Sequence, residues 1–191
     1  IFIENKSIEM KHLYLLTFTC LFMILSSCTD IKKNEDVSKT ITSTYYFIRH
    51  AEKDRTDSLD KNPHLTDIGK IRANHWSKIF GEVKFDAVYS TDYNRTKATA
   101  QPTADKNNLE ITLYDPKGID TKSFLEATEG KTVLVVGHSN TTPTFANKIL
   151  DQKKYDDIDD NNNGNLYIVT IIGKTISDQV LVIKMRIKNI R

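Results

Sequence analysis

Short apolar runs alternate with stretches of helical periodicity through the middle of the chain. The runs are rich in β-branched and aromatic residues, which favour strands. We predict strands at residues 45–48, 85–89, 109–114 and 132–136. We predict helices after Thr66 and at residues 94–105, 123–128 and 141–150. Because parallel strands need crossover connections, this alternation predicts a mainly parallel sheet that is covered on both faces.

The first predicted helix carries the clearest local signals. Thr66 suits the N-cap, since its hydroxyl can accept a backbone hydrogen bond, and Asp67 lies favourably in the first turn. Gly81 ends the helical pattern. The expected buried face consists of residues at helical spacing, namely Ile68, Ile71, His75, Trp76, Ile79 and Phe80.

The C-terminal part of the chain has a different pattern. Two β-rich runs, residues 166–172 and 179–187, are separated by Gly173-Lys174-Thr175. A short turn between two such runs is typical of a hairpin, so we expect a C-terminal hairpin or edge pair on the sheet. The expected fold is therefore α/β, a three-layer αβα sandwich with a mainly parallel central sheet.

The N-terminal residues do not fit the pattern of this domain. Met10 is followed by Lys11 and His12 and then by a mostly apolar run at residues 13–25. The run is shorter than the roughly 20 residues that span a bilayer, and it has the length of a secretory signal. It ends in Leu25-Ser26-Ser27-Cys28, which resembles the bacterial lipobox, whose cysteine is lipidated.

We therefore expect residues 1–28 to comprise nine upstream residues and a lipoprotein signal peptide, with Cys28 as the lipidation site. This expectation implies a protein that is exported to the bacterial cell envelope and lipid-anchored there, on the periplasmic or surface side. The alternative is a buried core helix. Residues 29–44 are polar and typical of a flexible tether, which leaves residues 45–191 as the folded domain.

Charge and cysteine content narrow the class of protein further. The chain has 27 Lys and Arg against 25 Asp and Glu, a net charge of +2, so charge gives no reason to expect a nucleic-acid partner. Membrane contact is expected through the N-terminal lipid only. The two cysteines are Cys20 and Cys28, so the expected domain has none with which to form a disulfide. The oligomeric state stays open.

Chemically capable side chains follow three of the predicted strands. Arg49 and His50 follow the first strand. Ser90 and Arg95 follow the second, and His138 follows the fourth. Ligands of open α/β sheets bind beyond the carboxyl ends of the strands, so we expect these residues at one rim. A neutral imidazole can attack phosphorus while guanidinium groups hold the phosphoryl oxygens, so the set predicts phosphoryl transfer through a histidine.

Four motifs surround these residues. They are Arg49-His50-Ala51-Glu52, Pro63-His64-Leu65-Thr66-Asp67-Ile68-Gly69, Ser90 with Arg95-Thr96-Lys97-Ala98-Thr99-Ala100, and Val136-Gly137-His138-Ser139. Together they resemble the histidine phosphatase (phosphoglycerate mutase-like) superfamily, and its short phosphohistidine-phosphatase-like branch in particular, over residues 45–150. The resemblance implies an enzyme without metal or other cofactor, whose partner is a small phosphorylated substrate or a phosphoprotein.

The resemblance also implies a role for each matched residue. His50 would be the phosphorylated nucleophile. Arg49, Arg95, His138 and Ser139 would bind the phosphoryl group. Ala51 stands where the family usually has glycine, a change that is tolerated unless the backbone needs a positive φ there.

The motifs do not assign the general acid. Many members of the family supply a Glu or Asp between the second arginine and the second histidine. The candidates in this chain are Asp115, Asp120 and Glu126, with Glu52 beside the nucleophile as a further candidate. One of these carboxyl groups would protonate the leaving oxygen.

These features predict a metal-independent phosphatase that hydrolyses phosphomonoesters or phosphorylated protein through phospho-His50. A non-catalytic phosphate- or phosphoester-binding lipoprotein with the same pocket is the alternative, and a phosphoglycerate mutase-type phosphotransferase is a minor one. The segment between residues 102 and 131 is short and predicts an open pocket. An open pocket disfavours the mutase, which needs a closed site to retain its intermediate.

Two further motifs have ordinary interpretations. Gly137-His138-Ser139-Asn140-Thr141 lacks the last glycine of a Gly-x-Ser-x-Gly nucleophile elbow, which disfavours a serine hydrolase. The Asp/Asn run at residues 156–164 has Thr170 where an EF-hand needs Glu, so we expect a polar turn. His64 and His75 are expected to be structural.

Overall fold

The structure is a computed structural model that describes residues 40–185. The elements in chain order are β1 (Thr42–Arg49), α2 (Asp67–Ile79), β2 (Ala87–Ser90), α3 (Asn94–Asn107), β3 (Ile111–Leu113), α4 (Thr121–Ala127), β4 (Thr132–Gly137), α5 (Thr141–Leu150), β5 (Asn165–Ile172) and β6 (Thr175–Val182). The expected signal peptide and its Cys28 lie outside the described residues. Across residues 40–185, no helix combines the length and the hydropathy that a bilayer span requires.

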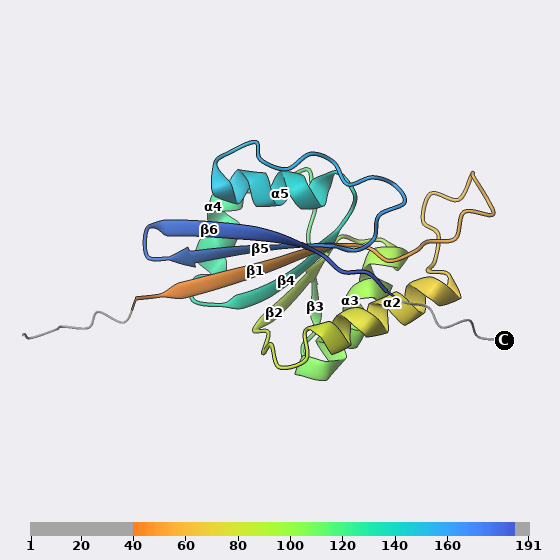
Figure 1. Ribbon diagram of the computed structural model, residues 1–191, viewed down its shortest axis with the longest axis horizontal. Helices are drawn as coiled ribbons and strands as arrows, with labels where there is room; N and C mark the ends of the chain where they lie inside the picture. The colour runs from red at the N-terminus through yellow and green to blue at the C-terminus, as the bar shows by residue number, and fades with distance from the viewer. Residues whose placement is uncertain (1–39, 186–191) are drawn as a thin grey trace, which may run out of the picture. The chain divides into compact units, whose positions relative to one another are not determined.

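The six-stranded sheet keeps its parallel strands together and has an antiparallel pair at one edge. The strand order is β3-β2-β4-β1-β5-β6. The first four strands in this order are parallel, whereas β5 is antiparallel to β1 and β6 to β5. Helices α2 and α3 lie on one face of the sheet, and α4 and α5 lie on the other (Figure 1). The predicted α/β fold with its C-terminal strand pair is confirmed.

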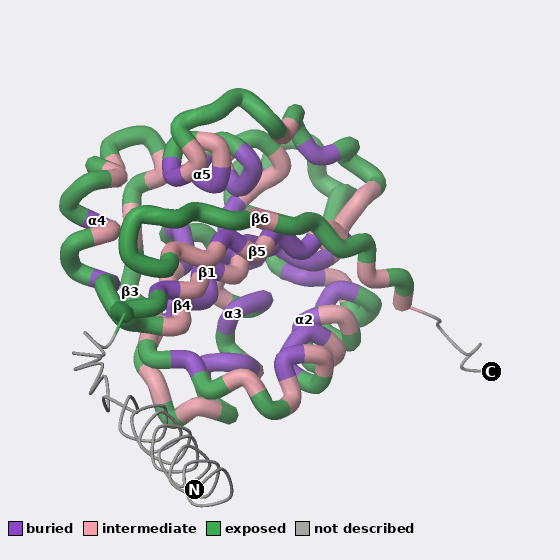
Figure 2. The backbone as a smooth tube through the Cα atoms, turned by 60° about the vertical axis from the view of Figure 1, so that its left-hand side comes forward, coloured by how far each residue is buried: buried purple, intermediate pink, exposed green. Residues whose placement is uncertain are grey.

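Strand residues alternate between two cores, one on each face of the sheet. On β1, Tyr45 and Phe47 belong to the core under α4 and α5, and Ile48 belongs to the core under α2 and α3. The first core is completed by Phe124, Phe145, Ala146 and Ile149, and the second by Trp76, Ala100 and Ala104. Figure 2 shows the inner strands buried and β6 exposed along its length. The continuous apolar runs of β1 and β4 thus reflect burial on both faces.

Strand β1 begins earlier than expected. Its first residue is Thr42, inside the predicted tether at 29–44, because β5 pairs with it from Thr42 opposite Ile172 onward. Residues 42–44 are polar, so the apolar pattern does not mark them as strand. Ser43 is nevertheless buried, and its hydroxyl accepts a 2.8 Å hydrogen bond from the Gly130 N–H. The folded unit therefore starts before Tyr45.

The last strand also differs from its prediction. Strand β6 runs over Thr175–Val182 rather than 179–187. Gly173, with φ of +58°, and Lys174 form the turn, so that Thr175 already pairs with Ile172. Most side chains of β6 are exposed on both faces, and no alternation of apolar and polar residues marks its register.

Helix α2 buries only part of the face that its apolar residues predict, which includes Phe80 at its C-cap. The N-cap is confirmed, since the Thr66 hydroxyl accepts the N–H of Gly69 at 3.0 Å. Trp76 is buried as expected, but Ile68 and Ile71 are exposed. The other buried residues of the helix are Gly69, Ala73 and Ser77. Small side chains bring α2 close to its neighbours, and Ser77 donates a 2.9 Å hydrogen bond to the Pro102 carbonyl of α3.

This assignment predicts unequal effects of two truncations on α2. Trp76 is 1% exposed and Ile71 is 41% exposed. We expect Trp76→Ala to lower the free energy of unfolding by about 3–5 kcal/mol, because it leaves a large cavity. We expect Ile71→Ala to change it by only about 0.5 kcal/mol. Urea unfolding of both variants tests this, and equal losses would show that the apolar pattern had identified the buried face after all.

Candidate active site

The register of β1 against β4 brings the two predicted site histidines together. Arg49, the last residue of β1, lies opposite Gly137, the last residue of β4. His50 and His138 therefore follow neighbouring parallel strands, at the same carboxyl end of the sheet. Their ring centroids are 5.8 Å apart. The predicted rim of the sheet is the place where these residues meet.

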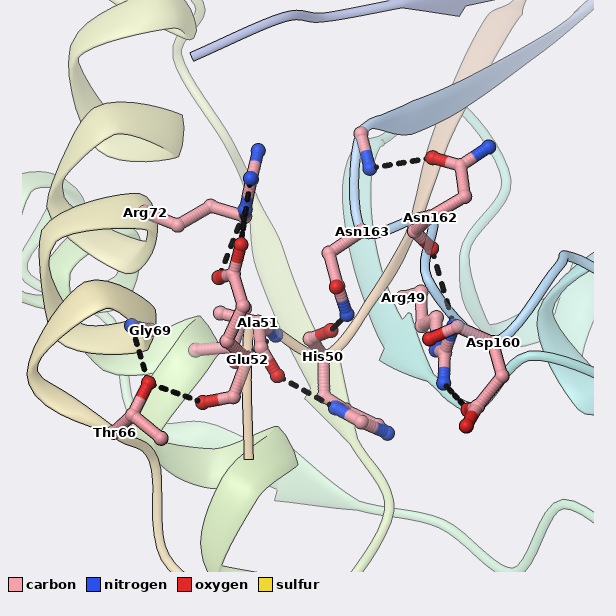
Figure 3. Close-up of polar contacts among 12 residues, drawn as sticks. Arg49, His50, Ala51, Glu52, Thr66, Gly69, Arg72, Asp160, Asn162 and Asn163 are labelled. Atoms are coloured by element: carbon pink, nitrogen blue, oxygen red, sulfur yellow. Dashed lines mark hydrogen bonds and ion pairs between the residues drawn. The ribbon is translucent and has the colours of Figure 1, made fainter. Parts of the chain in front are cut away.

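His50 is held as a neutral imidazole with one defined tautomer. Its Nδ1 lies 2.7 Å from the Ala51 carbonyl oxygen, which can only accept, so Nδ1 carries the proton (Figure 3). Burial, with smaller contributions from Arg49, Arg95 and His138, lowers the pKa of His50 to about 3. The ring is therefore neutral near pH 7, and its lone pair is on Nε2.

The backbone around His50 is fixed from three directions. The Ala51 N–H donates to Thr99 Oγ1 at 2.9 Å, and the Asn163 side-chain amide donates to the His50 carbonyl at 2.8 Å. The Glu52 carbonyl accepts the Thr66 N–H at 2.9 Å. Ala51 does not adopt a positive φ, so its Cβ causes no backbone strain where the family usually has glycine. Residues 50–52, which follow β1, are thus fixed at the carboxyl end of that strand.

Gly69 explains why a helix can begin so close to this loop. A Cβ built at Gly69 would lie 2.2 Å from the Glu52 carbonyl oxygen, which is far inside van der Waals contact. The motif that ends in Gly69 therefore allows α2 to pack its first turn against the nucleophile loop. Arg72, one turn later, forms a bidentate ion pair with the Glu52 carboxylate at 2.6–2.9 Å.

His138 is placed by residues of the connection between β2 and α3. Thr91 Oγ1 lies 3.1 Å from His138 Nε2, and the Tyr93 ring meets the imidazole edge to face at 4.9 Å. Burial, together with Arg95, Arg49 and Lys53, lowers the pKa of His138 to about 4. The same cations that lower this pKa would favour an anion beside the ring.

Arg95 and Arg49 offer hydrogen-bond donors that no protein atom accepts. Arg95 lies in the first turn of α3 and is 9% exposed, and its guanidinium stacks on the Tyr93 ring at 4.4 Å. Across residues 40–185, no acceptor meets the buried Nε and Nη1 of Arg95 or the buried Nε of Arg49. Buried charged donors without partners are costly, so these three groups indicate a site for an anion.

The terminal nitrogens of Arg49 are used within the protein. Nη1 donates to the carbonyls of Asp159, Asp160 and Asn162 at 2.8–3.1 Å. Nη2 pairs with the Asp160 carboxylate at 2.6 Å. These residues belong to the Asp/Asn run, which we predicted only as a polar turn. This run is a turn, but it also fixes the Arg49 guanidinium. The contacts join residues about 110 positions apart, and the sequence carries no local signal for them.

A cavity of about 650 Å³ opens on the His138 side of the site. Its lining comprises Thr91, Asp92, Tyr93, Leu113, Tyr114, Asp115, Pro116, Lys117, His138, Asn140 and Thr141. Asp115 is the one general-acid candidate among these residues. The cavity is large enough for a leaving group beside the phosphoryl site.

The other acid candidates have structural partners. Glu52 is paired with Arg72. Asp120 is the N-cap of α4 and accepts the N–H groups of the first turn. Glu126 is exposed on α4, 3.9 Å from Lys122. These three positions do not line the cavity beside His138.

The remaining predicted residues lie near the site in supporting roles. The buried Ser90 hydroxyl donates to the Thr91 carbonyl at 2.9 Å, and the Ser139 carbonyl accepts the Ile158 N–H at 2.8 Å. His64 is exposed, with its Nε2 3.3 Å from Asn94 Nδ2, and His75 is half-buried. In the described part of the chain, no three His, Cys, Asp or Glu side chains are grouped in a way that could hold a metal ion.

Three solved structures share this fold at low sequence identity. SixA from Agrobacterium tumefaciens, named as a phosphohistidine phosphatase, is 14% identical, with a TM-score of 0.54 over 73% of this chain and 97% of that chain. A phosphoserine phosphatase from Entamoeba histolytica, solved with phosphoserine, is 16% identical, with a TM-score of 0.52 over 72% and 94%. Phosphoglycerate mutase from Bacillus anthracis is 13% identical, with a TM-score of 0.56 over 74% and 93%.

A family comparison adds the sequence relationship. Comparison with curated proteins finds no match. The family model described as histidine phosphatase superfamily (branch 1) matches residues 45–116, which include Arg49, His50 and Arg95. The matched segment runs from β1 to just after β3, and the solved structures share the fold beyond it.

Proposed function

We propose that this protein is a phosphatase that hydrolyses phosphomonoesters through a phosphohistidine intermediate on His50. One observation carries the proposal: the neutral His50 ring lies near Arg49 and Arg95, whose guanidinium groups have three buried nitrogens without a protein acceptor among the described residues. A nucleophile next to unpaired cationic donors suits a phosphoryl group, whose negative charge those donors stabilise during transfer.

In the first step, His50 Nε2 attacks phosphorus and the bond from phosphorus to the ester oxygen breaks. The proton stays on Nδ1, hydrogen-bonded to the Ala51 carbonyl oxygen, and this bond stabilises positive charge on the ring as the phosphorus–nitrogen bond forms. Arg95, Arg49 Nε and His138 hold the phosphoryl oxygens. Asp115, which lines the adjoining cavity, donates its proton to the leaving oxygen.

In the second step, water attacks the phosphohistidine. The Asp115 carboxylate takes a proton from this water, the phosphorus–nitrogen bond breaks, and inorganic phosphate leaves. His50 returns to the neutral tautomer set by Ala51. Both steps balance without an added metal or redox partner, and one carboxyl group serves first as acid and then as base.

The substrate in this proposal is a small phosphorylated molecule or a phosphorylated protein side chain. The cavity supports this class, because apolar and polar groups from Tyr93, Leu113 and Lys117 line it beyond the phosphoryl site. Structural neighbours are named for phosphohistidine and phosphoserine as substrates. We also propose, from the lipobox-like residues Leu25-Ser26-Ser27-Cys28, that the protein is lipid-anchored in the cell envelope.

The phosphorylated intermediate provides the direct test. We expect the full-length protein, mixed with p-nitrophenyl phosphate and EDTA and denatured in alkali, to carry phosphate on Nε2 of His50. Mass spectrometry of peptides detects it, and acid removes it because the phosphorus–nitrogen bond is acid-labile. We expect His50→Ala to lose the label and to lower turnover by roughly 10³–10⁶-fold. His64→Ala is the matched control and keeps both.

Two outcomes would contradict this proposal. Undiminished turnover in His50→Ala would exclude His50 as the nucleophile. Phosphate binding without turnover of any phosphomonoester would instead support the alternative of a phosphate-binding protein.

The general acid is testable by the choice of leaving group. We expect Asp115→Asn to lower kcat/KM for an alkyl phosphate by about 10²-fold or more, since an alkoxide needs a proton to leave. The loss for p-nitrophenyl phosphate is expected to be much smaller, because p-nitrophenolate leaves unprotonated. Asp120→Asn and Glu126→Gln are controls that remove a carboxylate elsewhere. Equal losses for the two substrates in Asp115→Asn would remove Asp115 from this role.

The neutral state of the two histidines predicts a pH dependence of stability. Their pKa values, about 3 for His50 and about 4 for His138, lie below the 6.5 of an ordinary histidine. Between pH 4 and pH 6.5 the unfolded chain binds more protons than the folded chain. The free energy of unfolding therefore falls as the pH falls from 6.5 toward 4. We expect the double variant His50→Asn, His138→Asn to lose less stability in this range.

Urea unfolding at pH 7 and at pH 4.5 measures this difference. His64→Asn, which removes an exposed imidazole, should follow the unsubstituted protein. An unchanged pH dependence in the double variant would mean that the two rings are already protonated or exposed in the folded state.

A further inference from the structure

The segment at residues 159–163 has no part in the proposed chemistry, yet it contacts both Arg49 and His50. We propose that Asp160 is a positioning residue, which fixes the Arg49 guanidinium so that its Nε–H faces the phosphoryl site. The inference rests on the proposed function, because it assigns the phosphoryl group to that N–H. It also gives a role to the Asp/Asn run of the sequence.

Arg49 uses three of its five N–H bonds within the described protein and keeps two, the Nε–H and one N–H of Nη2. A guanidinium carries five N–H bonds, one on Nε and two on each terminal nitrogen. Nη1 meets three backbone carbonyls, and Nη2 meets the Asp160 carboxylate. Only Nε is buried without an acceptor in the described structure. Most of the guanidinium therefore serves to set its plane, which aims the Nε–H.

Asp160 supplies the negative charge for this arrangement. Arg49 is 2% exposed and lies near the cations Arg95 and Lys53. The pKa values of these two groups are lowered, first by burial and then by neighbouring arginines that include Arg49. A buried cation among other cations needs an ionic partner. The Asp160 carboxylate lies 2.6 Å from Arg49 Nη2 and 2.7 Å from Arg55 Nη1.

The position of Asp160 argues against competition with substrate. Its side chain is 62% exposed and is shared with Arg55, so it lies on the solvent side of Arg49. The guanidinium groups of Arg55 and Arg49 hold the pKa of the Asp160 carboxyl well below its usual range, so this carboxyl stays charged.

Asn163 extends the same support to the nucleophile. Its side-chain amide donates to the His50 carbonyl at 2.8 Å, three residues after Asp160. One short segment therefore fixes the orientation of Arg49 and the backbone of His50 together. A shift of this segment would move both groups relative to the phosphoryl site.

Substitutions at Asp160 test the proposal in the full-length protein. We expect Asp160→Ala to weaken competitive inhibition by vanadate, a mimic of the transition state, by about 10–100-fold and to lower kcat/KM in parallel, because a misplaced catalytic group costs up to about 10² in rate. Asp160→Asn keeps an acceptor oxygen, so its vanadate inhibition and its kcat/KM should lie between those of the unsubstituted protein and those of Asp160→Ala. Asp157→Asn removes the same charge from an exposed neighbour and should change neither quantity.

A double-mutant cycle separates positioning from a general structural role. If Asp160 acts through Arg49, adding Asp160→Ala to Arg49→Ala has no further effect on vanadate inhibition. Additive losses would overturn the proposal. Tighter vanadate binding in Asp160→Ala would also overturn it, because that result identifies Asp160 as a competing anion.

The phosphohistidine label keeps the two hypotheses distinct. A wild-type protein that forms phospho-His50 while Asp160→Ala and Asp160→Asn retain full vanadate affinity disproves the positioning role alone. A wild-type protein without the label disproves the proposed function, and with it the assignment of Arg49 Nε to a phosphoryl group.

Discussion

The parallel pairing of β1 with β4 is the constraint on which the site depends. Because these strands run in the same direction and end in register, Arg49 opposite Gly137, the two histidines that follow them emerge side by side. If the two strands were antiparallel, the histidines would lie at opposite ends of the strand pair. The strands are buried on both faces, so the groups at their ends enter a region of low dielectric constant. The topology thus sets both the geometry and the electrostatics of the site.

Burial has two consequences that act together. It lowers the pKa of His50, so the imidazole is neutral and carries its lone pair at Nε2. It also leaves donors of Arg49 and Arg95 without a protein acceptor among the described residues. An anion that enters the site satisfies these donors, and a phosphoryl group is also the partner for the imidazole. The protein therefore keeps an unfavourable charge arrangement that a phosphorylated ligand relieves.

The sequence predicts those features that arise from local pattern or from strand ends. The apolar runs identify β1 and β4, and the residues after them identify His50 and His138. The buried face of α2 could not be predicted in this way, because the helix packs through small residues such as Gly69 while Ile68 and Ile71 remain exposed. The register of β6 lacks a buried face to reveal it. The contacts of Asp160 and Asn163 depend on chain segments far apart in sequence, and no periodicity reports such contacts.

The support of the proposed nucleophile and the cavity proposed for the leaving group use different parts of the molecule. Arg49 and the His50 backbone are fixed by residues 159–163, by α2 and by Thr99. The cavity on the other side of His138 is built from the segments that follow β2, β3 and β4. Changes in the latter can alter which leaving group fits without moving the nucleophile. The arrangement therefore allows substrate preference to vary in the cavity while the phosphoryl chemistry stays fixed.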